Sequence, residues 1–376
     1  MKPLALIIVV GILFGIATLI LSSSGESILG SFPPLKALVN KNKNANKKIE
    51  TSNIFRTIDE GEVWFPQSNT ISADTKIGNI GVLDIALDVV DSNIGYVGTA
   101  SNGLYKTINN GQNWEKLFDR NQVLLPNAGV LRVVQDTRKP DNIYLAAYQN
   151  ERGVFLKSTD KGLSFIQTYI AEYDKYAVSA ITVDPKNSNV IYIGTTQGGF
   201  FKSSDYGSSW EVIEWITGSI SEIVINNRNT NEIYVATSDR GLFRTEDGGK
   251  KWKNFAKEIS KAAASNQVKS IQIDPTNANI LYLGVTNGLL KSLDRGESWK
   301  FLEMLIPPTN LPIDSVKVDP TDRNNVYVGV KDLIYKSEDG GTNWSVKRII
   351  LPTKEKRISV ITIDTKEPQS VYLGIR

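Results

Sequence analysis

An eight-residue motif recurs seven times along the chain, and this repetition constrains the fold more than any other feature. The motif is [Ser/Thr]-x-Asp-x-Gly-x-x-[Trp/Phe], and six of the seven Trp in the chain stand at its last position. Its third position is held by Asp59, Asn109, Asp160, Asp205, Asp247, Asp294 and Asp339. Its last position is held by Trp64, Trp114, Phe165, Trp210, Trp252, Trp299 and Trp344.

The chemistry of the motif is that of a tight hairpin turn. An Asp carboxylate, or the Asn109 amide, can accept backbone N–H groups in the turn, and Gly permits a positive φ. The Ser or Thr hydroxyl adds a local hydrogen bond, and the aromatic ring folds back as an apolar plug. We therefore predict that the third and last positions of the motif are structural.

Each motif follows three apolar runs, so each repeat unit contains four predicted strands. The second run carries a Tyr in six units, at Tyr96, Tyr144, Tyr192, Tyr234, Tyr282 and Tyr327. The third run ends in a basic residue immediately before the motif, and turn residues such as those at 274–277 separate the first two runs. Four short antiparallel strands in a unit of about 40–50 residues are typical of a propeller blade.

The two ends of the repeat region are complementary halves of one unit. Residues 358–363 and 371–373 supply two strands without a following motif, whereas residues 54–56 and the first motif supply the missing two. Joining them closes the ring and leaves no open sheet edge. The predicted fold is all-β: a seven-bladed β-propeller of four-stranded antiparallel blades over residues 53–376, its closing blade formed by 53–66 with 358–376, preceded by one N-terminal transmembrane helix.

The N-terminal segment predicts a membrane anchor. Residues 3–21 carry no charge, and a helix of this length spans about 28 Å, close to the hydrocarbon thickness of a bilayer. We assign residues 1–22 to the anchor, with a cleaved signal peptide as the alternative, although its apolar core is usually about 7–15 residues. Residues 23–52 are rich in Ser, Asn and Lys and predict a flexible linker. The propeller is then expected outside the cytoplasm, membrane-anchored or secreted.

The chain contains no Cys and no His. Disulfides, thiolate chemistry, Ser-His triads and metal sites built on His or Cys are therefore excluded within the chain. After residue 52 there are 37 basic and 38 acidic residues, so the domain gives no electrostatic reason to expect nucleic acid. We expect no catalytic residue, no metal and no cofactor.

The motif and its flanks resemble those of the Asp-box (BNR) superfamily, most clearly at residues 241–252, Gly-Leu-Phe-Arg-Thr-Glu-Asp-Gly-Gly-Lys-Lys-Trp. The resemblance covers nearly all of 53–376 and is greatest to the photosystem II stability/assembly factor type. The sortilin N-terminal domain and the xyloglucanases are relatives. Similarity to the assembly factors implies a non-catalytic platform for membrane-protein partners. Xyloglucanases place catalytic Asp residues between two propellers, and this chain has repeats for one.

Candidate binding residues lie in the loops predicted on the face opposite the motifs: Arg152, Tyr169, Glu172, Tyr173, Asp174, Tyr176, Asp239 and Arg240. Segment 169–176 combines three Tyr, two carboxylates and a Lys, a composition that suits recognition of protein or sugar. The alternative is that its Tyr rings pack on neighbouring blades. Glu172 and Asp174 are the one pair of carboxylates considered for catalysis.

We predict a membrane-tethered, extracytoplasmic protein-binding or assembly-factor-like propeller without catalytic activity, monomeric, with a protein partner at or near the membrane. The alternative is a glycan-binding or glycoside-hydrolase-like propeller. Residues 253–264 predict a short helix covering the loop face. The Pro-rich loop 305–312 is a further candidate contact for a partner or the membrane.

Overall fold

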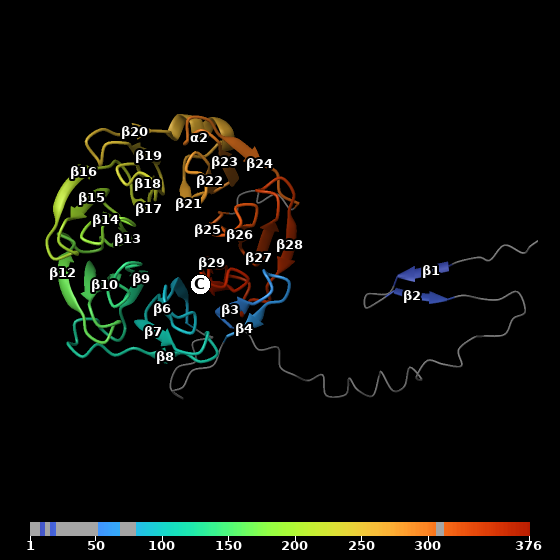
Figure 1. Ribbon diagram of the computed structural model, residues 1–376, viewed down its shortest axis with the longest axis horizontal. Helices are drawn as coiled ribbons and strands as arrows, with labels where there is room; N and C mark the ends of the chain where they lie inside the picture. The colour runs from blue at the N-terminus through green and yellow to red at the C-terminus, as the bar shows by residue number, and fades with distance from the viewer. Residues whose placement is uncertain (1–7, 12–15, 20–51, 68–79, 306–311) are drawn as a thin grey trace, which may run out of the picture. The chain divides into compact units, whose positions relative to one another are not determined.

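The computed structural model describes residues 8–11, 16–19, 52–67, 80–305 and 312–376, and the chain divides between residues 50 and 51 into two units. In the second unit, seven four-stranded antiparallel sheets stand in a ring around a central opening (Figure 1). This confirms the predicted seven-bladed propeller. We number the blades along the chain, and in each the first strand lies innermost.

Blade 1 contains β5 (Val82–Leu87), β6 (Gly95–Thr99), β7 (Leu104–Thr107) and β8 (Glu115–Lys116); blade 2 contains β9 (Gly129–Gln135), β10 (Ile143–Gln149), β11 (Arg152–Ser158) and β12 (Ile166–Ile170). Blade 3 contains β13 (Val178–Val183), β14 (Ile191–Thr195), β15 (Gly199–Ser203) and β16 (Glu211–Trp215); blade 4 contains β17 (Ile220–Ile225), β18 (Ile233–Thr237), β19 (Gly241–Thr245) and β20 (Lys253–Asn254). Blade 5 contains β21 (Val268–Ile273), β22 (Leu281–Val285), β23 (Gly288–Ser292) and β24 (Lys300–Leu302); blade 6 contains β25 (Ser315–Val318), β26 (Val326–Val330), β27 (Leu333–Ser337) and β28 (Ser345–Arg348).

Blade 7 is assembled from both ends of the propeller. Its inner strands are β29 (Ile358–Ile363) and β30 (Val371–Ile375), and its outer strands are β3 (Ile54–Thr57) and β4 (Phe65–Pro66). Strand β3 pairs antiparallel with β30, from Ile54 opposite Gly374 to Thr57 opposite Val371. The ring is thereby closed by backbone hydrogen bonds between segments more than 300 residues apart.

The second strand of each blade carries the core. In β6, β14, β18, β22, β26 and β30 all five residues are buried, because neighbouring blades cover both faces of the sheet. Such strands read as continuous apolar runs instead of alternating patterns. The buried clusters each span two adjacent blades, as where Leu242 of blade 4 shares a cluster with Leu283 of blade 5.

Each Asp-box turn uses the same three hydrogen bonds. The Ser or Thr hydroxyl donates to the Asp or Asn side-chain oxygen at 2.5–3.0 Å. The same hydroxyl oxygen accepts the Gly N–H at 2.7–3.0 Å. The side-chain oxygen also accepts the N–H four residues on, at 2.8–2.9 Å. The polar groups of the motif are therefore committed to the turn.

In some blades the recurring Tyr and base bind the Asp box of the next blade. In blade 5, the Tyr282 hydroxyl and the Lys291 ammonium donate to the Gly340 carbonyl of blade 6, at 3.0 and 2.7 Å. In blade 6, the Tyr327 hydroxyl donates to the Glu60 carbonyl of blade 7 at 3.1 Å. At these two interfaces the recurring residues therefore supply a polar contact at the rim.

Side chains also join the inner strands of neighbouring blades, whose backbones belong to separate sheets. The Asp84 carboxylate in blade 1 accepts the Val133 N–H of blade 2 at 2.9 Å. The Ser359 hydroxyl in blade 7 donates to the Val82 carbonyl of blade 1 at 2.7 Å. The Glu222 carboxylate in blade 4 accepts a backbone N–H of blade 5 at 2.8 Å. These bonds satisfy inner-edge groups that have no strand partner.

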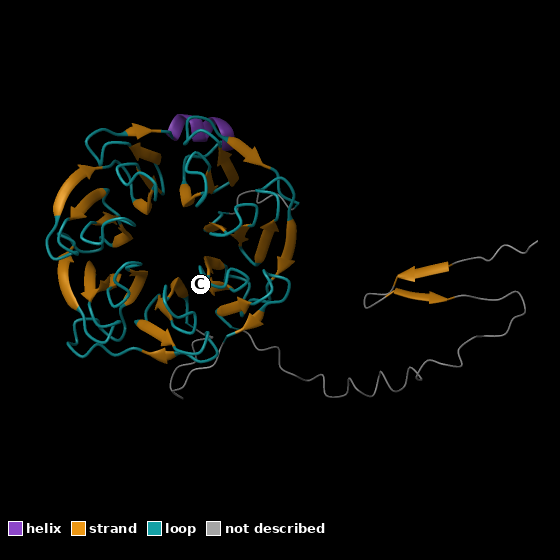
Figure 2. Cartoon of the chain, in the orientation of Figure 1, coloured by secondary structure: helices purple, strands orange, loops and turns teal. Residues whose placement is uncertain are grey.

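The insertion after blade 4 forms the predicted helix, α2 (Ala256–Ala263), drawn in purple in Figure 2. It buries Ile259 and Ala263 in the cluster shared by blades 4 and 5, and it contacts β19, β23 and β24. The helix therefore fills the rim between these two blades, whereas the sequence predicted that it would cover the loop face.

The N-terminal segment does not show the predicted transmembrane helix. Within residues 1–22 the structure describes β1 (Ile8–Gly11) and β2 (Ile16–Leu19), which form an antiparallel pair. These strands are rich in β-branched residues such as Val9 and Val10, which favour paired strands where no bilayer imposes a helix. In the part of the chain that the structure describes, no helix is long and apolar enough to cross a membrane. The predicted linker lies outside the described residues except for Ser52.

Replacing Trp114 by Ala should lower the free energy of unfolding by about 3–5 kcal/mol, because this fully buried ring would leave a cavity between blades. Ile108, in the same Asp box but 69% exposed, is the matched control, and Ile108→Ala should change stability by less than about 0.5 kcal/mol. Urea unfolding followed by circular dichroism measures both. Equal effects would contradict the structural role of the plug.

The Asp boxes also predict acid sensitivity. The backbone N–H and side-chain amide of Asn343 lower the pKa of Asp339 to about 2, and the Ser209 hydroxyl lowers that of Asp205. Because these folded-state pKa values lie below the unfolded value of about 3.9, their stabilisation is present above pH 4 and lost as pH falls toward 2. The free energy of unfolding, measured from pH 7 to pH 2, should therefore decrease between pH 4 and pH 2. Asp339→Asn should make the decline shallower, and an unchanged slope would refute this.

Candidate functional site

The two faces of the propeller differ in how their polar groups are used. On one face, the Asp boxes bind the turns between the first and second strands, as where the Gly340 N–H donates to the Asn324 carbonyl at 2.9 Å. The opposite face is built from the loops between second and third strands and the connectors between blades, such as 150–151, 171–177 and 238–240. We call it the connector face, and all eight predicted binding residues lie on it or beside it.

The connector between blades 2 and 3 is fixed to its neighbouring loop. The Arg152 guanidinium and the Asp174 carboxylate form an ion pair at 2.7 Å, with both side chains partly exposed. The Lys175 N–H donates to the Glu151 carbonyl, and the Gly153 N–H donates to the Tyr176 carbonyl, each at 2.7 Å. The structure thus brings Arg152 and Asp174 together and gives this connector a defined conformation.

The tyrosines of this segment divide into two groups. Tyr169 lies on β12 and packs edge-on against Phe201 of blade 3 at 5.0 Å, and burial raises its pKa to about 12. Its ring therefore joins two blades, as in the alternative that the tyrosines of this segment pack on neighbouring blades. Tyr173 and Tyr176 remain 58% and 36% exposed, edge to face at 6.4 Å. Glu172 beside them is exposed, whereas its possible partner Asp174 is bound to Arg152.

Asp239 and Arg240 form a second patch on blade 4. The Asp239 carboxylate accepts the Ser219 N–H of the preceding connector at 3.0 Å and pairs with Arg240 at 3.5 Å. The Arg240 side chain is 63% exposed. Within the described residues no hydrogen bond or ion pair joins this patch to the Tyr173 patch, so blade 3 separates them.

The structure reveals a third feature, a ring of equivalent residues at the mouth of the central channel. The residue that comes directly after the first apolar residue of each inner segment occupies an equivalent position in all seven blades. In six blades the pairing between the first and second strands shifts at this residue, as at a β-bulge. The seven positions, which we call the bulge ring, are Leu83, Leu131, Ser179, Ser221, Lys269, Asp314 and Ser359. All seven line one cavity of about 310 Å³, together with Arg132, Ser219, Ile220 and Arg376.

Charged groups from several blades line this cavity. The buried Asp314 carboxylate lies 2.9 Å from Arg357 and 3.4 Å from Arg376, and burial raises the pKa of Asp314 against the effect of these arginines. The Arg132 guanidinium of blade 2 donates to the Ser221 carbonyl of blade 4 at 3.0 Å. Lys269 is half-buried and makes no hydrogen bond or ion pair among the described residues. Nor is any group of three Asp or Glu side chains within those residues placed to hold a metal ion.

Sequence reasoning missed this ring, although a signal for it exists. Aligning the inner segments 82–85, 130–133, 178–181, 220–223, 268–271, 313–316 and 358–361 gives the pattern [Val/Ile]-x-x-[Ile/Val] in every blade. The position after the first apolar residue varies among Leu, Ser, Lys and Asp, between two apolar positions that are Val or Ile in every blade. Such variation at one fixed position indicates a shared location that packing alone does not determine.

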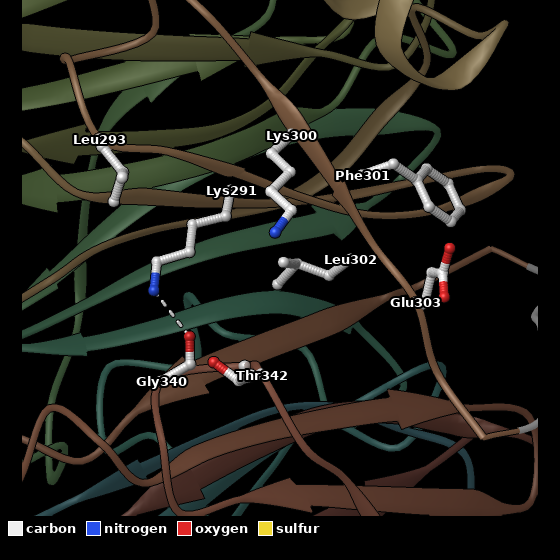
Figure 3. Close-up of a pocket in the computed structure, with 9 residues that line it drawn as sticks. Lys291, Leu293, Lys300, Phe301, Leu302, Glu303, Gly340 and Thr342 are labelled. Atoms are coloured by element: carbon white, nitrogen blue, oxygen red, sulfur yellow. Dashed lines mark hydrogen bonds between the residues drawn. The ribbon is translucent and has the colours of Figure 1, made fainter.

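A second cavity of about 470 Å³ opens at the outer rim between blades 5 and 6 (Figure 3). It is lined by residues 300–303 of blade 5 and by Gly340, Gly341 and Thr342 of the Asp box of blade 6. Its Lys291 ammonium already binds the Gly340 carbonyl, as the dashed line in Figure 3 shows. This groove is therefore a gap at a blade interface. The predicted Pro-rich loop 305–312 falls outside the described residues at 306–311.

The ring of blades and its seven identical turns define the class of the protein: an Asp-box β-propeller. A family model described as "Sortilin, neurotensin receptor 3" matches residues 198–303, which is less than half of the chain.

Individual relatives agree with this class. Xyloglucanase Xgh74A of Acetivibrio thermocellus is 26% identical over 144 residues, covering 35% of this chain and 17% of the enzyme. The crystal structure of a GH74 xyloglucanase from Xanthomonas campestris matches with a TM-score of 0.65 and 18% identity, over 79% of this chain and 51% of that one. YCF48 bound to D1 peptide matches with a TM-score of 0.58 and 17% identity, over 79% of this chain and 92% of that one. The chain thus spans about half or less of these xyloglucanases, and the structural likenesses show the fold.

The buried charge cluster generates a stability prediction. Asp314→Asn removes the carboxylate shared by two arginines, and we expect a loss of about 1–3 kcal/mol of unfolding free energy. Asp332→Asn breaks the more exposed pair with Arg348 and should cost less than about 1 kcal/mol. Chemical unfolding of both variants measures the difference. A smaller loss for Asp314→Asn than for the control would contradict the assigned ion pairs.

Proposed function

We propose that the chain is a non-catalytic binding propeller that holds a protein partner on its connector face. The observation that supports this most directly is a pair of exposed tyrosines, Tyr173 and Tyr176, on a connector fixed by three short polar contacts. Tyr and Arg are enriched among residues that dominate binding energy, and a surface that is already ordered loses little entropy on association. The exposed Arg240 of blade 4 extends the same face.

The proposed setting is outside the cytoplasm, with the propeller monomeric and tethered by residues 1–22 to a membrane that carries the partner. The uncharged run 3–21 and the polar segment after it motivate the tether. The likeness to YCF48, a propeller whose structure was determined with D1 peptide, motivates a polypeptide ligand. No cofactor is required for this role. Fractionation of cells expressing the full chain tests the tether, since release from membranes by salt or carbonate would count against it.

A glycan ligand is the second candidate. It is favoured by the local similarity to xyloglucanases and by Trp215, which is 53% exposed at the end of β16 and lies 6.0 Å from Phe201. Flat aromatic rings with a polar edge suit contact with sugars as well as with proteins. This candidate assigns the ligand to the outer end of blade 3 and predicts that Trp215, more than Arg240, controls binding.

Capture of partners from solubilised membranes tests the first candidate. A variant carrying Tyr173→Ala and Arg240→Ala should recover at least about tenfold less of any specific partner than the wild type, as expected for residues that dominate an interface. Leu293→Ala is the matched control, because Leu293 is 67% exposed within an Asp box on the opposite face. Partners recovered equally by all three proteins would refute the assignment of the connector face.

Affinity electrophoresis in xyloglucan tests the second candidate on the same proteins. Retardation that is lost in Trp215→Ala and kept in the Tyr173/Arg240 variant would support a glycan ligand. Absence of retardation for the wild type would remove it.

A further inference from the structure

We infer that the bulge ring at the mouth of the central channel is a binding site for a small carboxylate with an apolar body. The site lies on the connector face but needs no protein partner, so it can be tested independently of the proposed function.

The seven blades surround the ring, and the cavity that it lines opens at one face of the propeller. Its residues come directly after the connectors, and the first residues of the inner strands pair with the ends of the second strands, as Ile220 does with Thr237. The cavity therefore opens on the connector face. Its volume of about 310 Å³ is at the lower end of the range of roughly 300–1,000 Å³ for ligand pockets, which fits one small molecule.

One side of the ring carries two leucines and the other carries Lys269, while the Arg132 guanidinium reaches across from blade 2 to blade 4. Leu83 and Leu131 are neighbours in blades 1 and 2, both half-buried. In a ring of seven positions, blade 5 lies opposite the boundary between blades 1 and 2, and Figure 1 shows β21 across the opening from β9. Lys269, on β21, therefore faces the two leucines across the channel mouth. A ligand that satisfies both sides has an apolar body and one charged end.

The charged end must be an anion. The Lys269 ammonium is half-buried without a hydrogen bond or ion pair among the described residues, and a desolvated cation is stabilised by a counter-charge. Asp314 lies close enough to Lys269 for the two charges to interact, but Arg357 and Arg376 share that carboxylate as well, so three cations face one carboxylate. Positive charge thus exceeds negative charge on this side of the ring, and Arg376 offers further N–H donors.

The Ser179 and Ser359 hydroxyls of the ring do not donate to an anion, so its recognition depends on these cations. The Ser179 hydroxyl donates to the Ile220 carbonyl at 2.6 Å, and the Ser359 hydroxyl donates to the Val82 carbonyl at 2.7 Å. Their protons are used in joining neighbouring blades, so the ring presents serine lone pairs, which repel an anion. The ligand's charge is consequently confined to the Lys269 side. A carboxylate on an apolar body meets these demands, whereas a free phosphate meets only one.

Isothermal titration calorimetry on the purified full chain in low salt tests this site with three matched probes. Benzoate has both parts of the ligand, benzyl alcohol lacks the charge, and acetate lacks the apolar body. We expect benzoate to bind at least tenfold more tightly than either of the others. Inorganic phosphate binding as tightly as benzoate, or no heat with benzoate at millimolar concentrations, would overturn the inference.

Four variants locate the site. Lys269→Gln and Leu131→Ser should each weaken benzoate binding at least tenfold, whereas Lys269→Arg should keep it because the charge is retained. Lys300→Gln, in the outer groove between blades 5 and 6, is the matched control and should bind like the wild type. Thermal unfolding of each variant separates loss of binding from loss of fold. Unchanged binding in Lys269→Gln, or loss in Lys300→Gln, would place the ligand elsewhere and refute the proposal.

Discussion

The seven sheets of this propeller share no strand ladder, so the ring depends on contacts that side chains make from one blade to the next. Apolar burial supplies most of the attraction, but it has no direction and would let blades slide. Polar contacts fix the interface at both ends. At the channel, residues such as Asp84 and Ser359 bind backbone groups of the adjacent inner strand. At the rim, Tyr282 and Lys291 bind one carbonyl of the next Asp box.

This arrangement separates the positions that build the scaffold from those that are free to differ. The Asp box recurs with the same turn hydrogen bonds in every blade, and the Tyr of the second strand and the base of the third strand bind the next Asp box at interfaces such as that of blades 5 and 6. The connectors, the loops such as 238–240 and the bulge ring differ from blade to blade, although α2 and the ring serines also join neighbouring blades. Residue identity there varies from blade to blade, and the candidate binding residues other than Tyr169 belong to this second group.

The same separation explains what could be predicted from the sequence. The Asp boxes, the four-strand units and the closing blade follow from local chemistry and repetition, and the structure contains them. The bulge ring depends on register between strands, which periodicity alone does not give. Tyr169 and Tyr173 stand four residues apart in one segment of similar composition, yet Tyr169, on β12, packs partly buried against blade 3, whereas Tyr173, beyond the end of β12, is exposed. The membrane helix was expected from the hydropathy of residues 3–21. The β-branched residues of β1 are just as apolar in a strand, so hydropathy does not distinguish the two structures.

The closing blade has a consequence for the order in which the chain folds. Strands β3 and β4 are synthesised before every other strand of the ring, but β3 finds its backbone partner only when β30 exists. During synthesis, blades 1 to 6 can pack successively onto one another while Ile54 and Phe55 still lack their strand. A contact of such large sequence separation forms slowly. The apolar first strand of the ring is thus the last to be sheltered, and this interval is when the growing chain is most exposed to aggregation.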